Sequence, residues 1–296
     1  MSELNGIVVV NKEKGYTSHD VVNVIRRILG TRKVGHTGTL DPNATGVLPV
    51  CVGKSTRVSD MLMFSDKEYI AKVKLGITTD TYDAWGSVLS ENEVNVSESE
   101  LKSAISSFTG EIMQLPPMYS AIKQNGKKLY ELARSGIEVE RKERKITIYE
   151  CELISFENDT FKIRVKCSKG TYIRSLCHDI GQYLGCGACM TELVRTKASV
   201  FDIENSMTLS KIEEKVLKDG KNSVLQPPDT VFTEYEKLNV TEVVTNRLLN
   251  GALSRVDNAV GTYRAYAPDG RFVGIAEVFQ GEKGNVIKIV KAFTDR

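Results

Sequence analysis

Apolar residues follow two different periods along the chain, which predicts a mixed α and β architecture. Residues 6–12, GIVVVNK, form an apolar run of strand length. In residues 18–29 the apolar positions return at helical spacing, with Ser18 as the cap and Gly30 as the stop. The segment VGHTGTLDP, which follows at residues 34–42, is therefore predicted to be a loop.

Two later segments alternate apolar and charged residues with the period of a strand. In residues 68–76, EYIAKVKLG, one face carries Tyr69 at its start, followed by Ala71, Val73 and Leu75. The second segment, FKIRVKC, runs into SKGTYIRSLCHDIG. That strand-to-helix turn is predicted to present Tyr172 and Arg174.

Capping residues and prolines predict one more helix and a domain boundary. Ser97 and Glu100 form a capping-box pattern ahead of a helix that is predicted to end at Gly110. Paired prolines in QPPDTVFTEYEKLN interrupt the pattern and indicate a domain boundary. We predict a larger domain at residues 1–235 and a smaller one at residues 236–296. Alternating segments around Pro268-Asp269-Gly270 indicate that the smaller unit is β-rich.

Composition is that of an ordinary soluble protein. The 296 residues are 41% hydrophobic and 26% charged, so a sizeable core can be buried. No apolar run approaches the roughly 18 residues that a membrane helix needs, and the start lacks the order of a signal peptide. We therefore expect a cytoplasmic protein that needs no membrane, whose six cysteines remain thiols.

The formal net charge is only +2, but the positive residues are bunched. Residues 160–178 hold five basic residues and no acid, and residues 26–33 hold four. Residues 123–145 hold eight Lys or Arg against four Glu. Each block alone is typical of a solvated face, whereas their recurrence favours a nucleic-acid partner.

One acid stands in an unusually glycine-rich stretch, VGHTGTLDPNATGVLPVCVG. Gly35, Gly38 and Gly46 allow the backbone to approach a ligand closely, and Pro42 restricts Asp41 to an extended or turn conformation. Asp-Pro is also a common turn, so a purely structural role stays open. The spacing fits neither a Walker phosphate loop nor a dinucleotide fingerprint.

The stretch GHTGTLDPNATGVLPVCVGKSTR resembles the catalytic signature of the TruB family of tRNA pseudouridine synthases. Further stretches similar to that family follow in the expected order, namely NKEKGYTS, KEYIAKVKLGITTDTYDAWG, PPMYSAIKQNGKKLYELARSGIEV, CSKGTYIRSL, LGCGA and LVRT. The resemblance implies an α+β fold, with a catalytic domain built on a mixed, mostly antiparallel sheet flanked by helices and loops. It also implies a small β-rich, PUA-like RNA-binding domain at the C-terminus.

The resemblance implies isomerisation of the T-loop uridine of tRNA, uridine-55, to pseudouridine, with base flipping and with Asp41 as nucleophile. No cofactor and no metal are expected. The bond between N1 and C1′ must break, the base must rotate, and C5 must bond to C1′. An ionised carboxylate can attack C1′ or C6, or assist a glycal-type intermediate, and the sequence leaves these routes open.

Other site residues follow from the same resemblance. Arg174 is expected to pair with Asp41, and Tyr69 to stack on the extracted uracil and to take the proton from C5. Tyr172 and Leu193 are expected to line the same pocket. For Tyr69, Tyr172 and Leu193 a plain core position is the alternative.

His36 is expected to fill the gap left by the flipped base, and Lys12 to support the loop or a phosphate. The family's usual K-P-x-G reads Lys12-Glu13-Lys14-Gly15 here, which removes the rigid proline from that turn. The basic segment at about residues 117–145 matches the family's mobile insertion, which clamps the RNA.

Three alternatives remain open at this stage. Cys186 and Cys189 form a C-x-x-C that could hold zinc or act as a redox pair, although two packed thiols are the simpler interpretation. The protein could be a non-catalytic tRNA-binding or folding module, for which Asp41 is dispensable. It could also be a guide-RNA-dependent relative, although those carry a fuller RNA-binding domain and longer tails. We expect a monomer that binds the T arm of tRNA and requires no protein partner.

Overall fold

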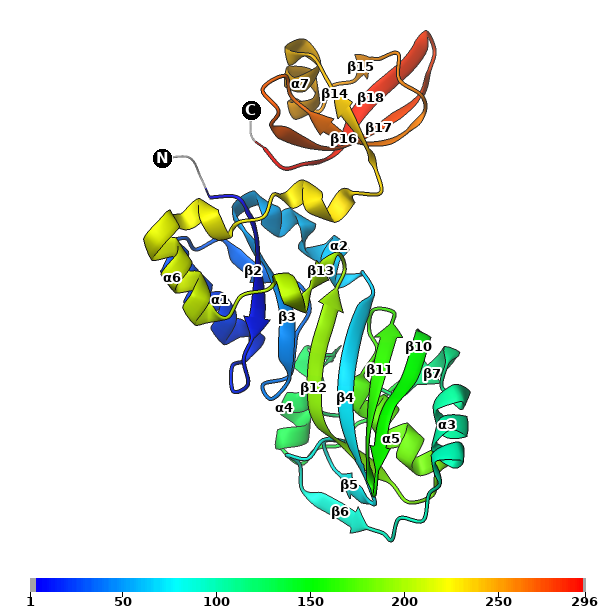
Figure 1. Ribbon diagram of the computed structural model, residues 1–296. Coiled ribbons are helices and arrows are strands. Elements are labelled where there is room, and N and C mark those ends of the chain that lie inside the picture. Colours follow the sequence, from blue (N-terminus) through cyan, green and yellow to red (C-terminus); the bar gives the residue numbers. More distant parts are fainter. Residues whose placement is uncertain (1–3, 295–296) are drawn as a thin grey trace.

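The computed structural model describes residues 4–294, which form two separate sheets with helices packed against them (Figure 1). The larger sheet has the strand order β1-β3-β12-β4-β11-β10-β7, with β2 paired to β3 and β13 paired to β12. Its strands are β1 (Gly6–Lys12), β2 (Val34–His36), β3 (Thr45–Val52), β4 (Lys67–Leu75), β7 (Gly110–Gln114), β10 (Arg144–Glu157), β11 (Thr160–Cys167), β12 (Ala188–Ala198) and β13 (Phe201–Asp202). Neighbouring strands are antiparallel except β12 and β3, which are parallel. The predicted mixed, mostly antiparallel α+β fold is confirmed.

Helices cover this sheet because each has one apolar face. The helices of this part are α1 (Ser18–Leu29), α2 (Ser59–Met63), α3 (Glu98–Ser107), α5 (Ile173–Tyr183) and α6 (Leu209–Asp219), with 3-10 turns η1 (Gly53–Val58), η2 (Ile203–Asn205), η3 (Lys221–Val224) and η4 (Pro228–Phe232). Leu176 and Ile180 of α5 belong to the same hydrophobic cluster as Ala71, Val73 and Leu75 of β4, as the alternation predicts. The inner face of β4 therefore lies under α5, and Tyr69 begins that row.

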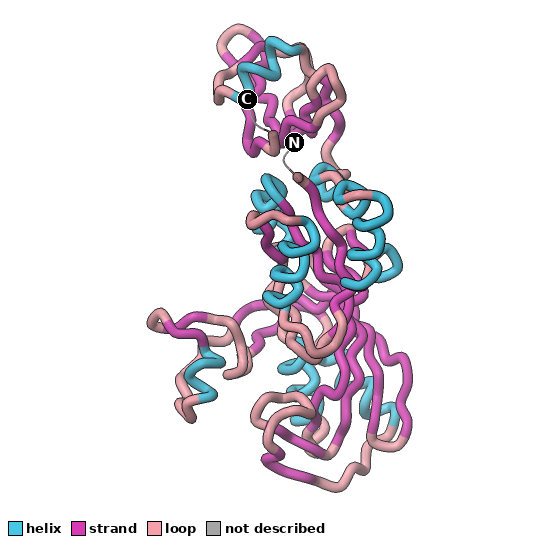
Figure 2. The backbone as a smooth tube through the Cα atoms, turned by 90° about the vertical axis from the view of Figure 1, so that its left-hand side faces the viewer, coloured by secondary structure: helices cyan, strands magenta, loops and turns pink. Residues whose placement is uncertain are grey.

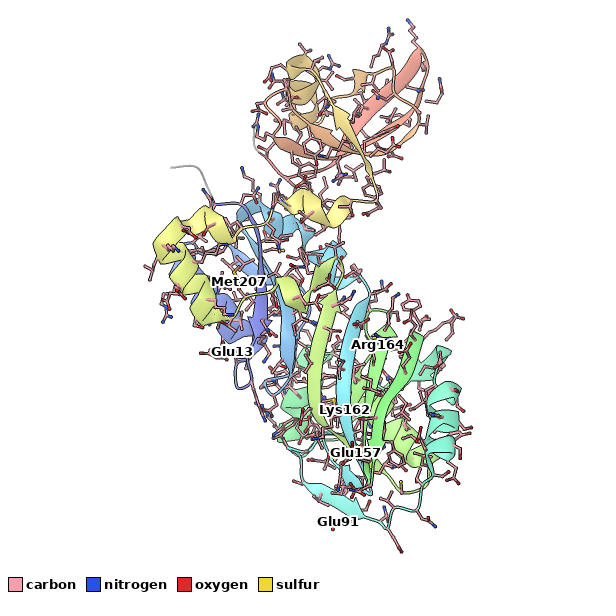
Figure 3. All side chains as sticks on the ribbon, in the orientation of Figure 1. Glu13, Glu91, Glu157, Lys162, Arg164 and Met207 are labelled. Carbon is pink, nitrogen blue, oxygen red and sulfur yellow. The ribbon has the colours of Figure 1, made fainter. Side chains whose placement is uncertain are left out.

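The opposite face of the sheet is charged and exposed, and Figure 3 labels Lys162, Arg164 and Glu157 on it. Arg164 Nη2 lies 2.5 Å from Glu152 Oε2, and Lys166 Nζ lies 3.6 Å from Glu150 Oε1. The acid-free sequence block at residues 160–178 is therefore not a continuous basic surface, because acids of the neighbouring strand stand beside it.

Three local predictions require correction. The N-cap of α1 is Thr17, which forms a capping box with Asp20, whereas Ser18 is buried and its hydroxyl bonds to the backbone of Leu40. Residues 34–36 are not loop: they form β2, because β3 supplies a hydrogen-bonding partner for them. Helix α3 has the predicted Ser97–Glu100 capping box but ends at Ser107, since Gly110 already starts β7.

The smaller sheet has the order β14-β16-β17-β18-β15, and α7 (Glu242–Leu249) lies beside it. Its strands are β14 (Glu236–Asn239), β15 (Ser254–Arg255), β16 (Gly261–Tyr266), β17 (Phe272–Gly281) and β18 (Gly284–Ala292). The turn between β16 and β17 holds Gly270 at φ 81°, which accounts for a glycine there. Phe232, Phe293 and Ile275 share a hydrophobic cluster with Ile7 and Val9 of β1, so apolar contacts join the two sheets.

Two smaller hairpins extend from the larger sheet. Strands β5 (Ile77–Thr79) and β6 (Val88–Glu91) form one, next to the end of β4. The other belongs to residues 115–143, which contain β8 (Lys123–Gln124), β9 (Lys127–Lys128) and the helix α4 (Leu129–Arg134). Figure 2 shows this second segment, called the arm below, projecting away from the sheet. Among residues 4–294, no helix is both long and apolar enough to cross a bilayer.

Candidate active site

Asp41 lies in the loop between β2 and β3, and short contacts fix that loop. Its own carbonyl accepts a hydrogen bond from the Ala44 N–H at 3.0 Å, which closes the Asp-Pro turn. The neighbouring Leu40 is buried, and its backbone bonds to Ser18 of α1. Gly38 has φ 101°, a conformation that favours glycine. The Asp41 side chain is 37% exposed, so its carboxylate is held in place while remaining reachable from solvent.

Arg174 brings a buried guanidinium to this carboxylate. It lies in the first turn of α5, and its side chain is only 7% exposed. Its Nε is 2.9 Å from Asp41 Oδ2, and its Nη2 donates to Asp41 Oδ1 at 3.2 Å. The remaining donors reach the carbonyls of Thr81, at 3.1 Å from Nη1, and Tyr119, at 2.8 Å from Nη2. The forked contact fixes the orientation of the carboxylate as well as its charge.

Tyr172 immediately precedes α5 and is held through its backbone. Its N–H donates to Gln114 Oε1 at 2.8 Å, and its carbonyl accepts from Gln114 Nε2 at 3.0 Å. Gln114 is itself buried at the end of β7. This reciprocal pair sets the start of α5, and thus the position of Arg174, relative to the sheet. Burial raises the pKa of the Tyr172 phenol.

The inner face of the sheet carries Tyr69, Leu193 and Arg195, with Ala71 between them. Tyr69 pairs with Arg195 and Ala71 pairs with Leu193 across β4 and β12, so all four point to one side. Leu193 is 7% exposed, and Tyr69 is half-buried. The pKa of Tyr69 is raised, mainly by desolvation, while the neighbouring Arg195 guanidinium opposes that rise. The phenol is therefore protonated at neutral pH and lies beside a cation.

His36 and Lys12 flank the loop from two directions. His36 ends β2, its Nδ1 is buried without a hydrogen-bond partner among the described residues, and desolvation lowers its pKa. Lys12 is fully buried, and its Nζ donates to the carbonyls of Tyr16 at 2.7 Å, Glu13 at 3.1 Å and Pro42 at 3.1 Å. Burial lowers the pKa of Lys12 to about 8. Lys12 thus ties the loop after β1 to the residue that follows Asp41.

Two residues at the site were not singled out from the sequence. Arg195 is 1% exposed, and it donates to the carbonyl of Val47 at 2.7 Å and to that of Gly38 at 3.2 Å. Asp83 Oδ2 lies 3.9 Å from Arg174 Nε, and desolvation raises the pKa of this carboxyl. The signal for Arg195 was readable, since a charged residue occupies an inward position of an alternating strand. Asp83 has no comparable signal, because its loop has no period.

Substitution of Arg195 by alanine is expected to lower the free energy of unfolding by about 2–5 kcal/mol. The change removes a large buried side chain and leaves the Val47 and Gly38 carbonyls without their donor. Urea denaturation measures the effect, with Lys197→Ala as the control on the same strand. Lys197 is exposed, so its loss should leave the free energy of unfolding close to that of wild type. Equal stability of Arg195→Ala and wild type would contradict this role.

No metal centre is formed by the described residues. Between residues 4 and 294, no three His, Cys, Asp or Glu side chains lie close enough together to hold a metal ion. Cys186 and Cys189 are both buried free thiols, and burial raises the pKa of Cys189. Cys186 belongs to the same hydrophobic cluster as Leu176 and Ile180 of α5.

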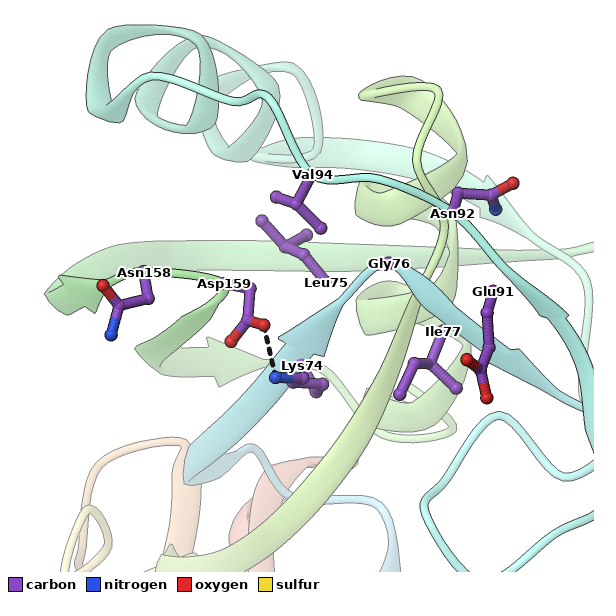
Figure 4. A pocket seen from close by; sticks show the side chains of 9 residues that line it. All are labelled: Lys74, Leu75, Gly76, Ile77, Glu91, Asn92, Val94, Asn158 and Asp159. Carbon is purple, nitrogen blue, oxygen red and sulfur yellow. Dashed lines mark hydrogen bonds and ion pairs between the residues drawn. The ribbon is translucent and has the colours of Figure 1, made fainter.

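A surface pocket at the far end of β4 is separate from the Asp41 loop (Figure 4). It is lined by residues of the turns after β4, β6 and β10, and an ion pair between Lys74 and Asp159 crosses it. None of the residues assembled around Asp41 lines it.

Comparisons with known proteins identify the family. Residues 26–173 match the family described as TruB family pseudouridylate synthase (N terminal domain), and residues 174–233 match the tRNA pseudouridylate synthase B C-terminal domain. Together these ranges span well over half of the chain. The chain belongs to the TruB family. The predicted enzyme class, a tRNA pseudouridine synthase, is confirmed by these matches.

Similar proteins cover nearly the whole TruB chain. Proteins named tRNA pseudouridine synthase B are 47% identical over 282 residues in Clostridium tetani, covering 93% of this chain and 96% of the relative, and 49% identical over 280 residues in Clostridium novyi, covering 92% and 95%. A solved chain titled "Crystal Structure of a Cbf5-Nop10-Gar1 Complex" is 28% identical with a TM-score of 0.73, covering 98% of this chain and 85% of that one. Both family matches end before β14, so the PUA-like nature of the smaller sheet stays a prediction.

Proposed function

We propose that this enzyme isomerises uridine-55 in the T loop of tRNA to pseudouridine, with Asp41 as the nucleophile. The observation that carries the proposal is the forked contact of Arg174 with Asp41, 133 residues apart in sequence. It holds one partly exposed carboxylate in a single orientation. Such a group suits attack on one carbon of a bound nucleotide.

The reaction requires one bond to break and one to form at the same sugar carbon. Attack of an Asp41 oxygen at C1′ displaces the uracil as an anion, and return of the base through C5 releases the carboxylate. In the second route the carboxylate adds to C6, the base leaves C1′ and bonds to it again through C5, and elimination from C6 releases the carboxylate. In the third route Asp41 takes the C2′ proton as the base leaves, and C2′ regains a proton when C5 bonds to C1′. All three routes require an ionised Asp41, and the forked contact with Arg174 holds that carboxylate in one orientation.

Tyr69, Leu193 and Tyr172 are proposed to receive the flipped uracil. Tyr69 offers a flat ring and a protonated phenol on the inner face of the sheet, and Leu193 adjoins it on the neighbouring strand. The isomerisation requires a proton to reach N1 of the detached uracil and another to leave C5. The Tyr69 phenol is proposed to give its proton to the uracil anion, and the resulting phenolate, favoured by the nearby Arg195, to take the proton from C5. His36 is proposed to stack in the space that the uridine leaves.

The arm is proposed to hold the RNA backbone. It exposes Lys123, Lys127 and Lys142, and such side chains contribute affinity without reading sequence. Lys127→Ala combined with Lys142→Ala should weaken tRNA binding and lower the slope of log Kd against log salt by about 1–2, with an unchanged single-turnover rate at saturation. Filter binding at several salt concentrations measures this. A salt slope equal to that of wild type would contradict the assignment.

The site of modification is tested on a T-arm stem–loop RNA and on the same RNA with cytidine at position 55. Carbodiimide treatment followed by primer extension should give one stop at position 55 for the uridine RNA and none for the cytidine RNA. No guide RNA is added, so a stop there also argues against the guide-dependent alternative. Modification at another uridine, or none with bound RNA, would contradict the proposal.

A further inference from the structure

An exposed tryptophan lies close to the Asp41 carboxylate and is connected to it by a short chain of contacts. Trp85 lies in the loop between β5 and β6, and its backbone N–H donates to Asp83 Oδ1 at 3.1 Å. The other carboxylate oxygen of Asp83 is 3.9 Å from Arg174 Nε, and Arg174 holds Asp41. Trp85 is thus joined to the nucleophile through only two side chains.

Lys14 connects the Trp85 ring to the Asp41 loop from the opposite side. Its Nζ lies 5.2 Å from the centroid of the Trp85 ring. The next residue, Gly15, donates its N–H to the carbonyl of Pro42 at 2.9 Å, and Pro42 follows Asp41 directly. The ring and the ammonium therefore lie at the rim of the site on two loops. The Trp85 loop contacts Arg174 through Asp83, and the Lys14 loop contacts Pro42 through Gly15.

Both loops are firmly anchored, whereas the two side chains are exposed. The Ala84 N–H donates to the Met190 carbonyl at 2.9 Å, and the Met190 N–H donates to the Tyr82 carbonyl at 3.0 Å, which attaches the Trp85 loop to β12. Trp85 is nevertheless 44% exposed, and Lys14 is also exposed. An exposed contact between an ammonium and an aromatic ring is weak, so a stacking base can displace the ammonium from the ring.

We infer that Trp85 and Lys14 form a subsite for an unpaired RNA base next to the target uridine, with the base stacked on the indole and the ammonium on a nearby phosphate. The inference rests on the proposed function, because it takes the occupant from the same RNA. Extraction of one base exposes the faces of its neighbours, and an aromatic ring at the rim restores their stacking without reading their identity. Lys14 supplies the charge that a phosphate requires.

The chain provides its own probe, because Trp85 is its single tryptophan. A T-arm stem–loop RNA carrying fluorescein at its 3′ end is titrated into the protein while anisotropy and tryptophan emission are both recorded. The emission of Trp85 should be quenched with the same midpoint as the anisotropy change. Unchanged emission at RNA saturation overturns the inference.

Variants separate stacking from a structural contact. Trp85→Ala should raise Kd about tenfold, equivalent to about 1.4 kcal/mol, while Trp85→Phe, which keeps a flat ring, should raise it less than about threefold. The control is Tyr183→Ala, which removes an exposed aromatic at the opposite end of α5 from Arg174 and should leave Kd unchanged. Equal Kd values for Trp85→Ala and wild type, or equal losses for Trp85→Ala and Trp85→Phe, overturn the inference.

Activity is recorded separately on the same RNA. If wild type modifies the T-loop uridine while Trp85 emission stays constant, the proposed function stands and the subsite is overturned. Quenching without modification supports the subsite and counts against the proposed reaction.

Discussion

Replacement of Asp41 by asparagine is expected to lower the single-turnover rate of pseudouridine formation by at least about 10⁴-fold. Asparagine has nearly the same shape but no negative charge, so it cannot form or assist the bond at the reacting carbon. The measurement is release of tritium from tRNA labelled at C5 of uridine, because isomerisation exchanges that hydrogen with water.

Binding provides the control for this variant. The Asp41 side chain faces the site from a loop whose backbone contacts involve Leu40, Ala44 and Pro42, and these remain in Asp41→Asn. The Kd for tRNA should therefore stay within about threefold of wild type. A variant that binds normally and still releases tritium at more than a tenth of the wild-type rate would contradict the role of Asp41. It would show that catalysis does not depend on the Asp41 carboxylate.

Arg174→Lys is expected to reduce the single-turnover rate by about 10²–10³-fold at saturating tRNA. Lysine keeps the positive charge, but one ammonium cannot match both carboxylate oxygens and also reach the carbonyls of Thr81 and Tyr119. The carboxylate is then present without its orientation. The substitution should lower the single-turnover rate at saturating tRNA. It should change the tRNA concentration that gives half of this rate much less.

A matched substitution on strand β11 controls for the loss of a guanidinium. Arg164→Lys changes an exposed arginine that pairs with Glu152 on the far face of the sheet. Its activity should equal that of wild type, because exposed ion pairs contribute little and this one lies on the face of the sheet away from Asp41. Full activity of Arg174→Lys would contradict the need for the forked contact.

Elements could be predicted from the sequence where the pattern of apolar residues within a single segment indicates the secondary structure. The run at residues 6–12 became β1, which is continuous in apolar residues because both of its faces are buried. The alternation from Tyr69 to Leu75 became the inner face of β4, because only that face is buried. The three-residue strand β2 was missed, because glycine and histidine give no strand signal. Its conformation depends on hydrogen bonds to β3, a partner that local sequence does not identify.

The site was only partly readable, because its geometry comes from distant segments. Composition and spacing drew attention to Asp41, whereas its pairing with Arg174 followed from the family resemblance alone. Arg195 escaped notice since buried arginines are rare, and this one is stabilised by the carbonyls of Val47 and Gly38, which only the fold brings to it. The basic block at residues 160–178 misled for the converse reason: its acidic partners lie on β10.

The central claim is that the Asp41–Arg174 pair isomerises the T-loop uridine of tRNA. It is tested most directly by incubating one unmodified tRNA transcript with wild type and with Asp41→Asn, then mapping pseudouridine by carbodiimide treatment and primer extension. We predict a single stop at position 55 with wild type and none with Asp41→Asn, although both bind the transcript. A stop of equal strength with both proteins, or no stop with wild type, would contradict it.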